Sequence, residues 1–195
     1  MRVRAWPVVF LVGVMILESP AAAPETVAGR SLAEWTAELA STSRTRRLRA
    51  ALTLPSFGTV AVRPLAKALE HDDPGVIYWA ASGLGDLAHK STRTRSNYER
   101  LRGLLKHKSI GLRLSAAYAL SRIGETGSGV GVLAKGLEHP HRGVACAAAD
   151  FLARIGPPAA NAVPALIVAA RHKDYHVKGA ANEALKRIRA VKGGK

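Results

Sequence analysis

The sequence predicts an all-α protein in which about five antiparallel helical hairpins stack into an α-solenoid. Composition favours helices, because 48% of the 195 residues are hydrophobic but only 5% are aromatic, and β-sandwich strands prefer aromatic and β-branched residues. A short motif then recurs along the chain, and a second apolar segment precedes each copy. Since one hairpin cannot bury its own apolar faces, the copies must pack on one another.

The recurring motif has two small residues, a central leucine and, in most copies, an aliphatic residue three positions later. Its central leucines are Leu54, Leu84, Leu120, Leu152 and Leu185. They lie 30, 36, 32 and 33 residues apart, and we expect Leu120 and Leu152 to be core residues. Glycine follows three copies directly, where a helix end favours a left-handed residue. Pro55 interrupts the first copy, so we expect its helix to be broken there.

Each motif follows an apolar segment with helical spacing, at residues 32–39, 64–69, 98–105, 130–137 and 163–170. In the fourth segment Val130, Leu133 and Leu137 follow a helical period. Short polar turns join the two segments, and Asp73 before Pro74 predicts a helix N-cap. We therefore expect helix A, a turn, helix B and a link in every repeat. The glycines of residues 127–131 are interpreted as a flexible link.

The second helices share a pattern of proline, valine, two alanines, leucine and isoleucine-glycine. Its copies are residues 73–76 with 80–87, 112–113 with 116–124, 144 with 148–156, and 177–178 with 181–188. This pattern resembles the HEAT repeat, in particular the short bacterial kind shared with phycobilin-lyase-like proteins. The resemblance implies a right-handed solenoid whose B helices line the concave face. A basic residue after the valine is kept at Arg113 and Lys178 but replaced by Ile77 and Ala145, which weakens any salt-bridge ladder between repeats.

The resemblance covers residues 31–190, in repeats expected at 31–58, 59–88, 89–124, 125–156 and 157–190. Residues 24–30 are expected to be a linker, and residues 191–195 a basic tail.

The first 23 residues have the layout of a secretory signal peptide. Arg2 and Arg4 precede an apolar run of twelve residues, 6–17, and the small residues of 19–23 follow. Because the run is shorter than the roughly 20 residues that span a bilayer, we expect cleavage after Ala21 or Ala23. An uncleaved anchor is the alternative. The predicted location is periplasmic or extracellular, with membrane contact only transiently through the signal peptide.

Basic residues outnumber acidic ones by 29 to 14, which leaves a net charge of +15 and attracts anionic partners. Arg122, Arg154 and Arg187 occupy the same position in three successive B helices. They predict a positive stripe, because the planar guanidinium suits carboxylate, sulfate or phosphate. A second concentration includes Arg46 and Arg47. The alternative is that these charges are solvated. Export and the absence of interleaved aromatic residues disfavour nucleic acid.

Histidines recur once per repeat in the polar turns, at His71, His107, His139 and His172. They predict a row along the turn edge. His141 and His176 add to the last two turns, so four imidazoles could gather as zinc ligands where repeats four and five meet. Polar turns tolerate histidine freely, however, so no metal site is assigned. Trp35, Trp79 and Tyr118 suit either the core or a groove that stacks a ligand. The single cysteine, Cys146, is interpreted as a small core residue, with a reactive thiol as the alternative.

No catalytic motif is present. The glycines at 127–131 lack the Gly-Lys-Ser/Thr of a phosphate loop, so we assign no catalytic residue and no cofactor. The sequence therefore predicts a non-catalytic exported scaffold or adaptor that binds a protein partner through its B-helix face and basic edge, and an acidic partner would suit its charge. Two alternatives stay open. One is an enzyme or enzyme accessory of the phycobilin-lyase-like kind holding a small ligand such as a tetrapyrrole; the other is a general polyanion-binding surface protein.

Overall fold

A computed structural model of the chain describes residues 23–88 and 90–190. The predicted signal peptide, apart from Ala23, and the basic tail lie outside the described residues. Within the described ranges, no helix is both long enough and apolar enough to span a membrane.

The described chain begins with a small β-hairpin in the segment expected to be a linker. Strand β1 (Thr26–Val27) pairs antiparallel with β2 (Arg30–Ser31). The hairpin is attached to the first repeat, because the Trp35 indole N–H donates to the Val27 carbonyl at 2.9 Å. Ser31 then caps the first helix, with Glu34 completing a capping box.

The helices alternate between two sets in chain order. The A helices are α1 (Leu32–Glu38), α3 (Val62–Ala68), α5 (Arg95–Leu104), α7 (Thr126–Gly136) and α9 (Val163–Ala169). The B helices are α2 (Arg44–Thr53), α4 (Pro74–Leu87), α6 (Ile110–Ile123), α8 (Arg142–Ile155) and α10 (Tyr175–Arg189). Short 3₁₀ helices, η1 (Leu54–Ala61), η2 (Lys90–Thr92) and η3 (Pro157–Ala162), lie between them. The helix of the first motif ends at Thr53, just before Pro55, as expected.

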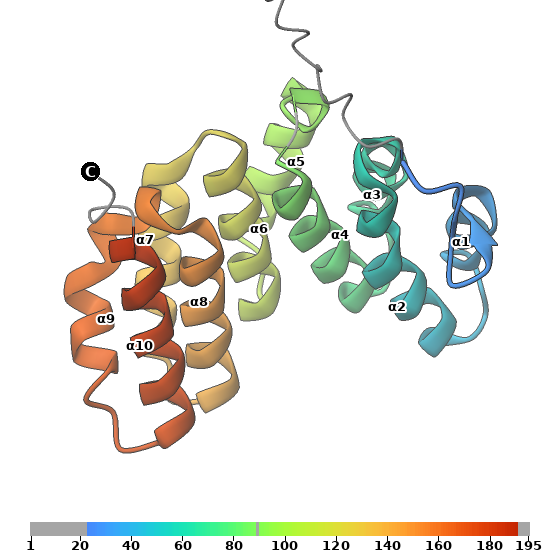
Figure 1. Cartoon of the computed structure of the whole chain (residues 1–195). Coiled ribbons are helices and arrows are strands. Elements are labelled where there is room, and N and C mark those ends of the chain that lie inside the picture. Colours follow the sequence, from blue (N-terminus) through green and yellow to red (C-terminus); the bar gives the residue numbers. More distant parts are fainter. Residues whose placement is uncertain (1–22, 89, 191–195) are drawn as a thin grey trace, which may run out of the picture.

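These helix pairs stack into an arch (Figure 1). Each B helix packs on the next B helix along the chain, whereas the A helices of neighbouring repeats touch little. Closer approach on one side of a stack bends it towards that side. The B helices therefore line the inner side of the arch and the A helices the outer side. The predicted fold class, an α-solenoid of stacked antiparallel helical hairpins, is confirmed.

The core runs along the stack between the two helix sets. Four of the central leucines have at most 1% of their surface exposed, and Leu185, in the last helix, has 8%. Helix α6 contributes to both halves of the core, with Leu120 facing the earlier repeats and Tyr118 the later ones. The prediction that Leu120 and Leu152 are core residues is confirmed.

The prediction of a flexible link at residues 127–131 is wrong, because this segment forms the first turns of α7. Gly129 is buried against α6, and an added Cβ would overlap Ser121 Oγ and the carbonyl oxygen of Ala117. Its lack of a side chain therefore serves close helix packing. Gly131, two residues later, has nothing within 4 Å of the same position.

Candidate functional site on the inner helix face

Two of the three predicted stripe arginines meet on the inner side of the arch. Arg154 of α8 forms an ion pair with Asp86 of α4, which also accepts a hydrogen bond from the Tyr118 hydroxyl at 2.6 Å. Arg122 Nε donates to the Gly85 carbonyl at 3.2 Å, and its Nη1 donates to the Arg154 carbonyl at 3.4 Å. Aligned positions in α4, α6 and α8 are thereby joined into one network.

Aromatic rings surround this network. Tyr118 stacks on Phe151 with centroids 4.7 Å apart, and the Arg154 guanidinium lies 4.5 Å from the Tyr118 ring centre. Tyr78 lies 6.2 Å from Phe151 and packs edge-on against Trp79. We call this group the inner cluster; its members are Tyr78, Asp86, Tyr118, Arg122, Phe151 and Arg154.

The inner cluster closes the middle of the inner face. Asp86 and Arg154 belong to the second and fourth repeats, so their ion pair spans the third. Beneath it Tyr118 and Ser115 of α6 are almost entirely buried. The inner face therefore has no open groove over α6.

Two carboxylates flank Arg154: Asp86 within the inner cluster, and Asp150 next to it at 3.7 Å. Arg122 donates instead to backbone carbonyls, and no ion pair is formed by it among the described residues. Burial raises the pKa of Tyr118 well above its usual value, and the hydrogen bond to Asp86 raises it further. Burial likewise raises the pKa of Tyr78. Both tyrosines stay protonated at neutral pH, and Tyr118 is a hydrogen-bond donor.

The other predicted partner-binding arginines lie apart from the cluster. Arg187 is exposed and pairs with Glu183 in its own helix at 2.7 Å. Arg46 is exposed on α2, and no ion pair is formed by it in the described part of the chain. Arg47 is half-buried; it donates to the carbonyls of Ser41 and Thr42 at 2.9 and 3.0 Å.

Arg47 also connects the first two repeats. Its Nη2 lies 2.9 Å from Asp73 Oδ2, and Arg44 lies 3.2 Å from the same oxygen. Asp73 caps α4 as predicted, accepting from the Gly75 N–H at 2.9 Å. Burial alone would raise the pKa of Asp73, but the hydrogen bonds from Arg47 and Gly75, with both arginine charges, lower it overall.

The histidine row does lie in the turns between A and B helices, and each member has the same structural contact. Its Nδ1 accepts the backbone N–H of the residue two positions later, with donor–acceptor distances of 2.8, 3.0, 3.1 and 3.0 Å for His71, His107, His139 and His172. The donor is the N-cap residue of the B helix. Nowhere in the described residues do three or more His, Cys, Asp or Glu side chains form a group able to hold a metal ion. Sequence analysis missed this role, although the fixed spacing from histidine to N-cap was its signal.

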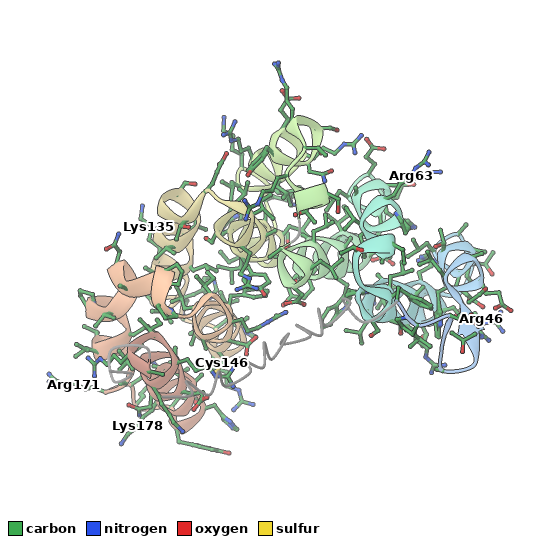
Figure 2. The ribbon with its side chains drawn as sticks, turned by 45° about the horizontal axis from the view of Figure 1, so that its top comes forward. Arg46, Arg63, Lys135, Cys146, Arg171 and Lys178 are labelled. Carbon is green, nitrogen blue, oxygen red and sulfur yellow. The ribbon has the colours of Figure 1, made fainter. Side chains whose placement is uncertain are left out.

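The aromatic residues singled out from the sequence do not form one set. Trp35 is buried in the first repeat, whereas Trp79 is half-buried beside the inner cluster and Tyr118 belongs to it. A cavity of about 410 Å³ lies elsewhere, between α1 and α3. Cys146 is half-buried on α8 (Figure 2). Burial and the nearby charge of Asp174 raise the pKa of its thiol, which disfavours a reactive thiolate.

Comparisons with known proteins agree with this geometry. Residues 130–193 match the family model for HEAT repeats. A search of curated proteins found no match. Among solved structures, an engineered protein is 24% identical with a TM-score of 0.52, over 82% of this chain and 79% of that one.

One natural and one designed repeat protein show a similar degree of structural likeness to this chain. The complex of CpcE and CpcF of phycocyanin lyase from Nostoc sp. PCC7120 is 23% identical with a TM-score of 0.53, over 89% of this chain and 69% of that one. A designed armadillo repeat protein in complex with the peptide (KR)4 is 18% identical with a TM-score of 0.53, over 80% and 81%. The fold is that of a helical-repeat solenoid. At these identities the likeness concerns the fold alone.

Proposed function

We propose that the protein is a non-catalytic exported scaffold that binds a protein partner through its inner helix face. The observation that carries the proposal is an exposed apolar side chain where that face is open. Leu52 of α2 aligns with Tyr118 of α6, yet 53% of its surface is exposed. Apolar patches rimmed by polar residues mark protein interfaces, and Leu52 would be the apolar centre of such a patch.

The inner face differs between the first two repeats, which expose side chains to a partner, and the middle of the arch, which the inner cluster occupies. The first two repeats present Leu52, the exposed Arg49 and the half-buried Trp79, while the inner cluster fills the middle. Because Asp86, Tyr118 and Arg154 satisfy one another, a scaffold role suits them better than proton transfer or nucleophilic attack. Structural neighbours of the armadillo-like and HEAT-like kind that bind peptides or partner proteins support a binding role.

The excess of basic residues favours an acidic partner. The peptide bound by the designed armadillo neighbour is basic, so its charge preference is not transferred to this chain. Of the proposed contact arginines, Arg46 and Arg187 are exposed and suit a direct test. Arg122, Arg154 and Arg47 also hold the fold together, so replacing them would change structure and binding at once.

Export is part of the proposal and has its own test. The amino-terminal charges, the short apolar run and the small residues at 19–23 support a signal peptide. Mass spectrometry of the protein recovered from its producing cell should find a chain that begins at Ala22 or Pro24. An intact amino terminus on a membrane-bound chain would instead establish an anchor.

Affinity capture with residues 24–195 tests the binding face. The test is specific because Leu52 has a matched control residue of similar exposure. Val60 of η1 is 50% exposed but does not lie on a B helix. A partner identified with the parent should be lost by Leu52→Glu and retained by Val60→Glu. Equal retention by both variants would refute the inner face. For the charge contribution, Arg46→Glu with Arg187→Glu should weaken binding more than Arg63→Glu with Lys135→Glu, whose side chains lie on the outer helices (Figure 2).

A further inference from the structure

The last outer helix, α9, exposes apolar side chains where earlier outer helices do not. Three of these helices can be aligned on a fully buried leucine, which is Leu65 in α3, Leu133 in α7 and Leu166 in α9. The two residues that follow it are Ala66-Lys67, Ala134-Lys135 and Ile167-Val168. Val168 is 70% exposed and Ile167 38%. The final repeat thus carries two aliphatic groups where α3 and α7 carry alanine and lysine.

These groups share one face of α9 with a cation. Pro164, Ile167, Val168 and Arg171 follow helical spacing, and the Arg171 N–H donates to the Val168 carbonyl at 3.0 Å. Arg171 is exposed, and within the described residues no ion pair involves it. Figure 2 shows it at the end of the solenoid, pointing away from the ribbon.

Helix α10 adds a basic stripe at the same end. Lys178, Lys186 and Arg189 are exposed at spacings that place them on one face. In α8 the aligned positions are small and buried, because α10 covers them; they are Ala145, Ala153 and Gly156. No described repeat follows α10, and its lysines and arginine take those positions.

Among the described residues, no carboxylate forms an ion pair with this stripe. Asp174 caps α10 and faces Arg142, and Glu183 pairs with Arg187, although its charge also acts on Lys186. We call Ile167, Val168, Arg171, Lys178, Lys186 and Arg189 the end surface. It combines exposed aliphatic groups with cations that form no ion pair within residues 23–88 and 90–190.

We propose that the end surface docks on an anionic lipid bilayer. The basic stripe spans about 16 Å at the rise of an α-helix. Two of its three cations are lysines, whose flexible point charges suit a dense field of headgroup phosphates. The aliphatic pair suits the boundary with the acyl chains. A nucleic acid or other polyanion would use the cations but leave Ile167 and Val168 in water. This surface is separate from the inner face, so each can fail without the other.

Cosedimentation with vesicles tests the proposal. Residues 24–195, which contain the whole solenoid, should bind vesicles of phosphatidylglycerol and phosphatidylcholine but not vesicles of phosphatidylcholine alone. Since each basic residue near an anionic surface contributes roughly fivefold in affinity, Lys178→Glu with Lys186→Glu and Arg189→Glu should abolish binding. Arg63→Glu with Lys67→Glu and Lys135→Glu, on α3 and α7, reverses the same number of charges and should reduce binding much less.

The decisive variant is Ile167→Ala with Val168→Lys, which gives α9 the residues that α3 and α7 carry. It adds a positive charge, so binding by electrostatics alone would become tighter. If the aliphatic pair enters the bilayer, affinity should instead fall about tenfold. Tighter or unchanged binding by this variant overturns the proposal, as does equal binding of the parent to neutral vesicles. Circular dichroism of every variant should show unchanged helicity.

Discussion

Asp86 of α4 and Arg154 of α8 form an ion pair across α6, although a whole repeat lies between their own repeats in the sequence. In a solenoid each repeat ordinarily contacts only its neighbours. This pair, with Tyr118 between its members, couples the second repeat directly to the fourth. It follows that the centre of the arch should be stiffer and more cooperative than a row of independent hairpins.

A double-mutant cycle measures this coupling. Asp86→Ala, Arg154→Ala and the double variant should give an interaction energy of about 0.5–2 kcal/mol in urea unfolding, since the pair shares a hydrogen-bonded network. The exposed pair Arg95 and Glu99, at 2.8 Å within α5, provides the control and should give a clearly smaller value. Additive single-variant effects at Asp86 and Arg154 would show that the closure does not stabilise the fold.

The core assignment predicts a large effect at Leu120. Its side chain is fully buried, so Leu120→Ala should lower the free energy of unfolding by about 2–5 kcal/mol through lost burial and a residual cavity. Leu52→Ala, at an exposed leucine, should change it by less than about 0.5 kcal/mol. Similar unfolding midpoints for the two variants would mean that the helix register is wrong.

Two glycines of α7 predict opposite effects of the same substitution. Gly129→Ala forces α7 away from α6 and should destabilise the protein by about 1–3 kcal/mol. Gly131→Ala meets open space and should stabilise it by about 0.5–1 kcal/mol, because alanine is the better helix former. Thermal unfolding of both variants checks this. A stabilising Gly129→Ala would contradict the close packing of the two helices.

The lowered pKa of Asp73 predicts an acid-dependent stability. A carboxyl whose folded pKa lies below its unfolded value binds fewer protons in the folded state. Its stabilising contribution is therefore complete above the unfolded value of about 3.9 and is lost as pH falls through the folded pKa. Asp73→Asn keeps a side-chain oxygen for the helix cap but removes the charge facing Arg44 and Arg47. Between about pH 5 and pH 2 this variant should lose less stability than the parent, as followed by urea unfolding. Parallel pH profiles would refute the role of the charge.

The fold could be predicted from the sequence because each repeat carries the same buried leucine, and four of the five carry the same histidine turn. The failure at residues 127–131 has a physical reason: glycine reads as a flexible link, yet Gly129 is required by the close approach of α6. Alignment placed Arg122, Arg154 and Arg187 at one helical position, but their partners depend on how sharply the stack bends. That curvature brings Asp86 into contact with Arg154, whereas Arg187 does not join the inner cluster and pairs with Glu183 in its own helix. The substitution of Ile167-Val168 for alanine and lysine was visible in the repeats, but its exposure needed the structure.

Hydrogen–deuterium exchange on the complex of residues 24–195 with its captured partner tests the central claim most directly. Binding through the inner face predicts slower amide exchange in α2 and α4, with the outer helices α3 and α7 unchanged. Protection confined to α3 and α7, with α2 and α4 exchanging as in the free protein, would contradict it.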